Sequence, residues 1–200
     1  MNASDKLLRL ARLSTAIVLG DWELVRTLRI DAPAGEPDRE WREAVLQTHL
    51  FGGFPRLVEA YGRLADAGGL GDPTPEEHEA TGSAERGAQL FDRIYGEGAT
   101  PVRQMLTTHS PDYAAMIAEH AYGRVLSRPG LAASTRELLA SCMLAALGQD
   151  RQLASHARGA IRCGATFDDL HACLGAVRDL MTPERYERSL RIAERFRRDA

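Results

Sequence analysis

The protein has 200 residues, 44% of them apolar, which is enough for a packed core in one large or two small domains. Its net charge of −3 at pH 7 gives no electrostatic basis for binding nucleic acid or an anionic membrane. The apolar runs are far shorter than the roughly 20 residues of a membrane span, and the N-terminus lacks the apolar region of a signal peptide, so we expect no membrane association.

Apolar residues recur with the helical period along the whole chain, and no segment alternates with the period of two that is typical of a strand. We therefore expect an all-α fold. The predicted helices cover residues 5–19, 22–30, 38–51, 55–67, 83–96, 111–128, 134–147, 151–163, 166 onward, and 183–197.

The helix ends carry recognisable signals. The polar residues expected to act as N-caps, because their side chains can accept hydrogen bonds from the first turn, are Asp21, Ser83, Ser110, Ser134, Asp150, Thr166 and Thr182. Ser134 and Glu137 also have the spacing of a capping box. The glycines expected to end helices are Gly20, Gly52, Gly53, Gly148 and Gly164.

Residues 68–82 are rich in glycine, proline and acidic side chains. We interpret them as a linker between an N-terminal unit over 1–67 and a C-terminal domain over 83–200. Within this linker, residues 74–77 could still begin a short helix, because proline is favoured at the first helical position.

The helices before the linker repeat the pattern of those after it. The segment KLLRLARLSTAIVLGD parallels STRELLASCMLAALGQD, which indicates a duplicated helical hairpin. In the first copy Arg9 lies opposite Glu137 and Thr27 opposite His156, and neither replacement titrates near neutral pH. We therefore expect a structural first copy and a functional second copy.

Two residues of the second hairpin could carry chemistry. His156 lies among small and apolar residues, and an imidazole can transfer protons near neutral pH. Glu137 lies on the preceding helix, and we expect its carboxylate within hydrogen-bonding range of the His156 ring, directly or through one water. Both residues have simpler interpretations, since His156 could be a core histidine bound to a carbonyl and Glu137 could serve only the capping box.

The glutamate and histidine of this hairpin, followed by the Gly-Ala-Thr of 164–166, resemble the carboxymuconolactone decarboxylase and alkylhydroperoxidase D superfamily. AYGRVLSRPGL at 121–131 and RGAQLFDRIYG at 86–96 are similar to other segments of the decarboxylases. The resemblance implies an AhpD-like helical fold, complete in the second unit and degenerate in the first. It also implies a homo-oligomer, a trimer or hexamer.

A physical reason for the oligomer comes from aromatic residues that short helices would hardly cover within 200 residues, namely Trp22, Trp41, Phe51 and Phe54.

Further pocket candidates follow from the family pattern. Gln47 and His49, in LQTHLFGGFP, resemble the end of the family's core and would supply a pocket wall from the first copy. The decarboxylases carry a glutamate after the glycine of the neighbouring segment, where this chain has Arg124. Glu119 could replace that glutamate, and His120 could line the pocket. Each also has the simpler interpretation of a polar residue on a helix surface.

The resemblance to the decarboxylases implies acid–base chemistry on a small organic acid or lactone. His156 would donate or accept the proton and Glu137 would orient the ring. The arginines that could hold an anionic substrate are Arg124, Arg128 and Arg158. No metal-ligand spacing occurs, and we expect neither a metal nor a cofactor.

Two alternatives remain open. The peroxidase branch has a C-x-x-C pair, whose positions are occupied here by Gln149 and Gln152, so an AhpD-like antioxidant function is disfavoured. A non-catalytic oligomeric ligand-binding protein is the other alternative. The odd number of cysteines, Cys142, Cys163 and Cys173, favours reduced thiols and a cytoplasmic location.

Overall fold

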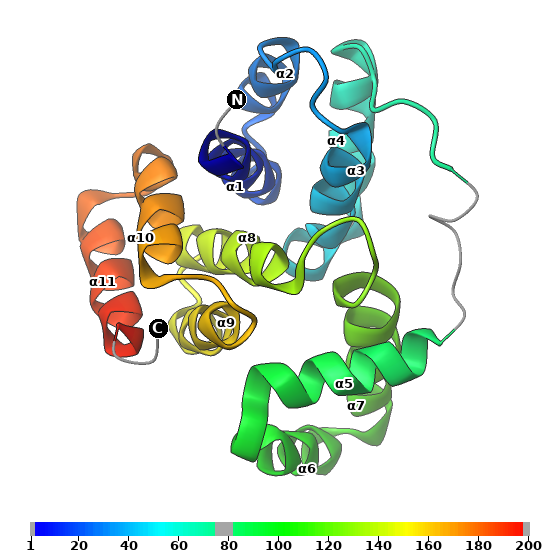
Figure 1. Cartoon of the computed structure of the whole chain (residues 1–200), viewed down its shortest axis with the longest axis vertical. Coiled ribbons are helices and arrows are strands. Elements are labelled where there is room, and N and C mark those ends of the chain that lie inside the picture. Colours follow the sequence, from blue (N-terminus) through cyan, green and yellow to red (C-terminus); the bar gives the residue numbers. More distant parts are fainter. Residues whose placement is uncertain (1–2, 75–81, 198–200) are drawn as a thin grey trace.

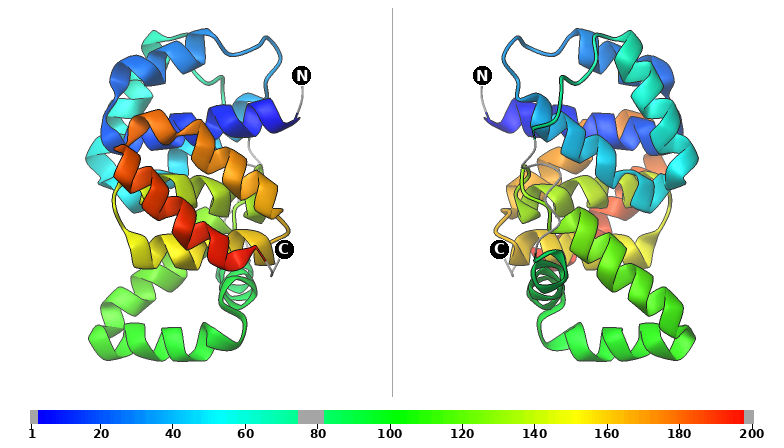
Figure 2. Two further views of the ribbon diagram at one scale, coloured as in Figure 1. Left: turned by 90° about the vertical axis from the view of Figure 1, so that its left-hand side faces the viewer. Right: turned by 90° about the vertical axis from the view of Figure 1, so that its right-hand side faces the viewer.

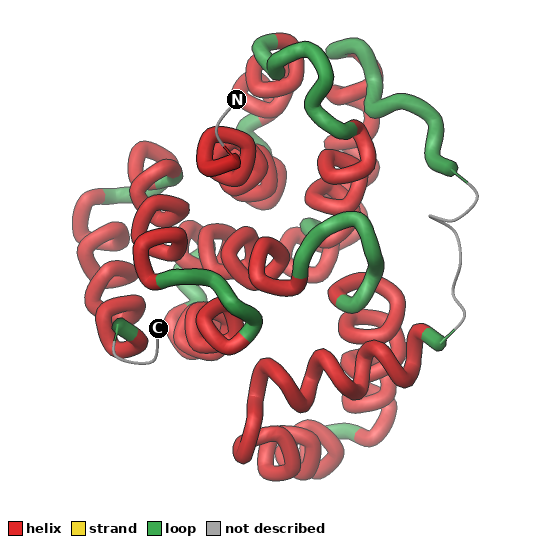
Figure 3. Tube along the Cα trace, in the orientation of Figure 1, coloured by secondary structure: helices red, strands yellow, loops and turns green. Residues whose placement is uncertain are grey.

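The computed structural model describes residues 3–74 and 82–197, and within those ranges every regular element is a helix, which confirms the all-α prediction (Figure 3). The α-helices before residue 75 are α1 (Ala3–Leu19), α2 (Trp22–Ile30), α3 (Asp38–Gln47) and α4 (His49–Asp66). Those after residue 81 are α5 (Ser83–Tyr95), α6 (Ala99–His109), α7 (Pro111–Met116), α8 (Ala133–Ala146), α9 (Asp150–Arg162), α10 (Phe167–Ala176) and α11 (Pro183–Ala193). A π-helix, η3 (Ile117–Leu126), continues α7.

One hydrophobic core joins the two ends of the chain. Helix α1 packs against α8 and α10, as Figure 1 shows, so residues more than 120 positions apart lie side by side. Leu13 and Ile17 of α1 and Leu139 and Met143 of α8 are fully buried in the same cluster. Since truncating a core leucine to alanine costs about 2–5 kcal/mol, this shared cluster is a main source of stability.

Helices α5, α6 and α7 with η3 form a lobe at the end of the molecule opposite α2 (Figure 2). It has a smaller hydrophobic cluster of its own, which includes Phe91, Ile94 and Tyr122. Helix α5 approaches η3 so closely that a Cβ added at Gly87 would lie 2.6 Å from the backbone nitrogen of Gly123. The two helices therefore touch through their backbones.

Four of the predicted N-caps are confirmed. Asp21, Ser110 and Thr182 accept hydrogen bonds from the backbone N–H groups three residues later. Thr166 forms a complete capping box with Asp169.

Three of the predicted caps are wrong. Ser83 and Asp150 are the first residues of α5 and α9, and Ser134 lies inside α8, whose N-cap is Ala132. The predicted capping box of Ser134 and Glu137 is therefore absent. The carboxylate of Asp150 instead forms ion pairs with arginines of α11, at 2.5 Å for Arg185.

The helix predicted over 38–51 is also wrong in extent. Helix α3 ends at Gln47 and α4 begins at His49, and the Thr48 hydroxyl between them donates back to the carbonyl of Val45 at 2.7 Å. The helix end predicted at Gly52 and Gly53 is instead a kink inside α4, where Gly53 has φ of 78°. The last helix ends at Ala193 and is followed by a 3-10 turn.

The aromatic residues differ in exposure. Trp41 is fully buried, so the prediction that a single chain would hardly cover it is wrong. Trp22 and Phe51 are half-buried. Phe54 is 63% exposed. The possible helix start at residues 74–77 extends beyond the described residues. No helix in the described part of the chain has the length and the low charge required to cross a bilayer.

Candidate functional site

Helices α8 and α9 pack side by side and bring Glu137 and His156 together. They are joined by a short turn in which Gly148 has φ of 76°, a value that favours glycine. The Nδ1 atom of His156 lies 3.0 Å from Oε2 of Glu137, so the contact predicted from the sequence is confirmed. The side chain of Glu137 is 2% exposed and that of His156 13% exposed. A Cβ at Gly159 would lie 2.5 Å from the same carboxylate oxygen, so glycine makes room for the pair.

The pair fixes the protonation chemistry of His156. Burial lowers the pKa of His156, but the charge of Glu137 and the hydrogen bond to it raise that pKa, and the net shift is upward. Because a carboxylate can only accept, Nδ1 carries the hydrogen and the proton is exchanged at Nε2. Among the described residues Nε2 has no hydrogen-bond partner. His156 is thus arranged as a proton donor or acceptor with one reactive nitrogen.

The raised pKa predicts a pH dependence of stability. Protonated His156 stabilises the fold fully below about pH 6.5, the ordinary pKa of histidine, and this contribution is lost as the pH rises through the higher pKa of the folded state. Glu137→Gln removes the charge responsible, so its unfolding free energy should lose this dependence. Urea unfolding between about pH 6 and 8 measures both curves. Parallel curves for the two proteins would contradict the prediction.

Three aromatic side chains lie near the pair. The Phe51 ring lies edge-on to the His156 ring, with centroids 5.7 Å apart. The Tyr122 hydroxyl donates to the Tyr95 hydroxyl at 3.2 Å. Burial raises the pKa of both tyrosines, and the negative charge of Glu137 raises it further. Both hydroxyls therefore remain protonated at neutral pH.

The other candidates from the sequence lie in different places. Glu119, Arg124, Gln149 and Gln152 are exposed. Gln47 is fully buried and donates to the backbone carbonyl of Arg136 at 3.3 Å, and its place in a pocket wall stays a prediction.

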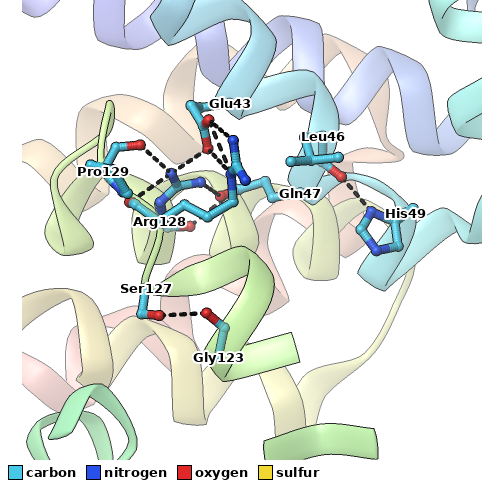
Figure 4. A network of polar contacts seen from close by, with 9 residues as sticks. Glu43, Leu46, Gln47, His49, Gly123, Ser127, Arg128 and Pro129 are labelled. Carbon is cyan, nitrogen blue, oxygen red and sulfur yellow. Dashed lines mark hydrogen bonds and ion pairs between the residues drawn. The ribbon is translucent and has the colours of Figure 1, made fainter. Parts of the chain in front are cut away.

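His49 and His120 contact each other, although they are 71 residues apart. Their Nε2 atoms are separated by 2.7 Å. His49 is also bonded through Nδ1 to the carbonyl of Leu46 (Figure 4). Burial lowers the pKa of His49, the bond to Leu46 opposes this, and the nearby His120 lowers it further.

The sequence did not indicate a buried ionic cluster around Glu43 (Figure 4). Its carboxylate pairs with Arg128 at 2.8 Å and with Arg136 at 2.7 Å, and the side chains of Glu43 and Arg136 are 2% and 1% exposed. Arg136 also donates to the carbonyl of Arg128 at 3.0 Å. Burial lowers the pKa of Arg136, and Glu43 opposes this effect. The cluster fixes the segment between η3 and α8 against α3, and so supports the start of the helix that carries Glu137.

The three cysteines are free and buried. Burial and the charge of Glu137 raise the pKa of Cys163 to about 11, although Arg93 opposes the shift. Cys142 is hydrogen-bonded to Cys173, and this bond together with burial raises its pKa well above the usual value. Since the thiolate is the reactive form, neither Cys142 nor Cys163 is activated.

We therefore expect no thiol peroxidase activity above that of a generic cysteine. The measurement is the turnover of an alkyl hydroperoxide with a thiol reductant, for the wild type and for Cys163→Ser. Rapid turnover that is lost in Cys163→Ser would contradict the prediction.

Parts of the chain are similar to known proteins. The chain is 30% identical over 136 residues to "Peroxisomal protein 2" of Schizosaccharomyces pombe. The matched region covers 64% of this chain and 62% of that protein. It is 38% identical over 65 residues to a 4-carboxymuconolactone decarboxylase of Acinetobacter baylyi. This matched region covers 32% of this chain and 48% of the relative. The matches thus span between about half and three fifths of these relatives. Residues 111–195, which include Glu137 and His156, match the model of the carboxymuconolactone decarboxylase family, so this part of the chain is similar to that family.

Proposed function

We propose that the protein performs acid–base chemistry on a small organic acid or lactone, with His156 as the proton donor or acceptor. The observation that carries this proposal is the hydrogen bond between Nδ1 of His156 and the buried carboxylate of Glu137. It raises the pKa of His156 and directs the exchangeable proton to Nε2. The similarity to a protein named 4-carboxymuconolactone decarboxylase supports a carboxylated lactone as substrate.

In this mechanism the substrate loses CO₂ from a carbon next to the unsaturated lactone, and the electron pair of the broken bond delocalises into a dienolate. The protonated His156 then delivers its Nε2 proton to carbon, and Glu137 stabilises the imidazolium until that transfer. General acid catalysis of this kind typically contributes about 10²–10⁴-fold. The hydroxyls of Tyr95 and Tyr122 lie near enough for the charge of Glu137 to affect their pKa.

Of the three candidate cations, Arg158 is favoured as the group that binds the substrate carboxylate. Arg128 is engaged by Glu43, and Arg124 is exposed. Arg158 is half-buried, its Nε atom lacks a hydrogen-bond partner among the described residues, and its charge opposes the burial that raises the pKa of Tyr95. An arginine whose guanidinium has an unpaired N–H can bind a carboxylate through two parallel hydrogen bonds.

The experiment is a survey of unsaturated lactone carboxylates in D₂O. Release of CO₂ with deuterium on the product carbon is expected, and His156→Gln should abolish it. His171→Gln is the matched control, because His171 is exposed on α10. If no compound in the survey is turned over, or if His156→Gln retains activity, the proposed function is wrong.

We also propose a homo-oligomer, a trimer or hexamer, in the cytoplasm. Phe54, Val58 and Tyr61 lie on one face of α4 and are 63%, 71% and 41% exposed. A contiguous apolar face of this kind is typical of a protein–protein contact. The free thiols fit a reducing compartment.

We therefore expect light scattering at micromolar concentration to give a multiple of the 21.9 kDa chain mass. Val58→Glu places a charge on this face and should shift the protein toward the monomer. A wild-type protein that is monomeric under these conditions would contradict the prediction.

A further inference from the structure

The contact between His49 and His120 joins two elements other than α8 and α9, which carry Glu137 and His156. His49 begins α4, and His120 lies in the π-helix η3 of the lobe. Their Nε2 atoms are 2.7 Å apart, with ring centroids at 5.0 Å and an interplanar angle of 62°. This is hydrogen-bonding geometry, which requires one nitrogen to donate and the other to accept.

The Leu46 carbonyl decides which nitrogen donates. A carbonyl can only accept, so Nδ1 of His49 carries a hydrogen and donates it to Leu46. A neutral His49 therefore has a bare Nε2, which accepts from Nε2–H of His120. The remaining nitrogen, Nδ1 of His120, has no hydrogen-bond partner among the described residues. The neutral pair thus has one arrangement of its protons and one unoccupied basic nitrogen.

The same arrangement limits the pair to one additional proton. A proton on Nδ1 of His120 makes that ring a cation, and its bond to the neutral His49 becomes charge-assisted. A second proton would have to enter Nε2 of His49, which would break the bond and place two cations side by side. Burial and the neighbouring His120 lower the pKa of His49, which agrees with this limit.

The first residues of α4 connect the pair to the site on α9. Phe54 stacks on His49, with centroids 5.0 Å apart and an interplanar angle of 15°, and it lies 6.3 Å from His120. Three residues earlier, Phe51 contacts His156. In the single chain Phe54 is 63% exposed and His120 is half-buried, so the histidine pair and the ring stacked on it lie at the surface of the subunit.

We infer that His120 is a second catalytic acid–base residue, which exchanges a proton at Nδ1 with the planar acid or lactone, and that His49 is its positioning residue. The inference rests on the proposed function, because His120 and His156 would serve the same substrate. If the substrate binds as its neutral acid, His120 would accept the carboxyl proton and His156 would deliver one proton to carbon after CO₂ leaves. The total number of protons on the enzyme is then unchanged, and the two rings re-equilibrate with water after each turnover.

The first test needs no substrate. Long-range ¹H–¹⁵N spectra of the labelled protein report the hydrogen on each imidazole nitrogen. At high pH we expect hydrogen on Nδ1 of His49 and on Nε2 of His120. On acidification a single proton should appear, on Nδ1 of His120. Hydrogen on Nε2 of neutral His49, or uptake of protons by both rings at the same pH, would overturn the inference.

Variants separate positioning from packing. His49→Gln offers a side-chain carbonyl that can accept from His120, so it should preserve the His120 tautomer, whereas His49→Leu should allow both tautomers. His171→Gln, the exposed control, should leave the His120 signals unchanged. Identical His120 spectra in His49→Leu and the wild type would show that His49 does not position His120.

The second test uses a substrate identified in the survey. The wild-type pH profile of kcat/KM should have two limbs, and His120→Gln should lose one limb with a fall in kcat of about 10²–10⁴-fold. If the survey identifies no substrate, the proposed function fails while the spectra still decide the state of the pair. A substrate turned over by His120→Gln at the wild-type rate would refute the catalytic role of His120 alone.

Discussion

The variant His156→Ala should lower turnover by about 10²–10⁴-fold while the protein remains folded. The substitution removes the only nitrogen of the pair that can exchange a proton with a ligand, since Nδ1 is held by Glu137. It also leaves the carboxylate of Glu137, 2% exposed, without its partner. A cost of about 1–3 kcal/mol in unfolding free energy should accompany the loss of activity.

The predicted duplication suggests a matched control. Thr27 is the residue that lies opposite His156 in the predicted duplication, and its side chain is exposed. Thr27→Ala should therefore leave turnover unchanged and the unfolding free energy within about 0.5 kcal/mol of the wild type. If His156→Ala instead lowers the melting temperature while activity survives, the histidine is a core residue with a satisfied hydrogen bond and the proposed mechanism is wrong.

Glu43→Gln should cause a large loss of stability, about 3–5 kcal/mol in unfolding free energy. The amide removes the negative charge shared by Arg128 and Arg136, and Arg136 is 1% exposed and cannot turn to water. Since small domains are stable by about 5–15 kcal/mol, the variant should be close to unfolding at 37 °C. Urea unfolding followed by circular dichroism measures the loss.

Two controls make this prediction specific. Glu40→Gln breaks the Lys6–Glu40 ion pair, whose side chains are 30% and 24% exposed, and should cost about 0–1 kcal/mol. The double variant Glu43→Leu with Arg136→Met replaces the most deeply buried pair by apolar groups and should recover stability relative to Glu43→Gln. Equal losses for Glu43→Gln and Glu40→Gln would show that the buried cluster contributes no more than an exposed ion pair.

The sequence was sufficient where the signal is local. Helical periodicity and the glycines Gly148 and Gly164 predicted α8 and α9, and the hairpin that they form places Glu137 opposite His156. The N-caps were less predictable. Ser134 satisfies every sequence criterion for a cap, but α8 begins one residue earlier, and boundary shifts of this size depend on tertiary packing.

Contacts between distant segments could not be predicted. Glu43 and Arg136 are 93 residues apart, and an arginine near the start of a helix normally lies in water. His49 and His120 were each identified as candidates for a pocket, but their contact depends on how the lobe docks against α4. Single-sequence periodicity describes which face of a helix is buried, not which distant helix covers it.

The backbone contact between Gly87 and Gly123 has a consequence for how this lobe can diversify. A side chain at Gly87 would meet main-chain atoms of Tyr122 and Gly123, within 2.6–2.9 Å, rather than a side chain that could be shortened in exchange. No second substitution elsewhere can therefore restore the fit. In related proteins with the same lobe, position 87 should remain glycine by itself and show no covariation with its neighbours. A library that randomises α5 should recover glycine there regardless of what is selected at position 123.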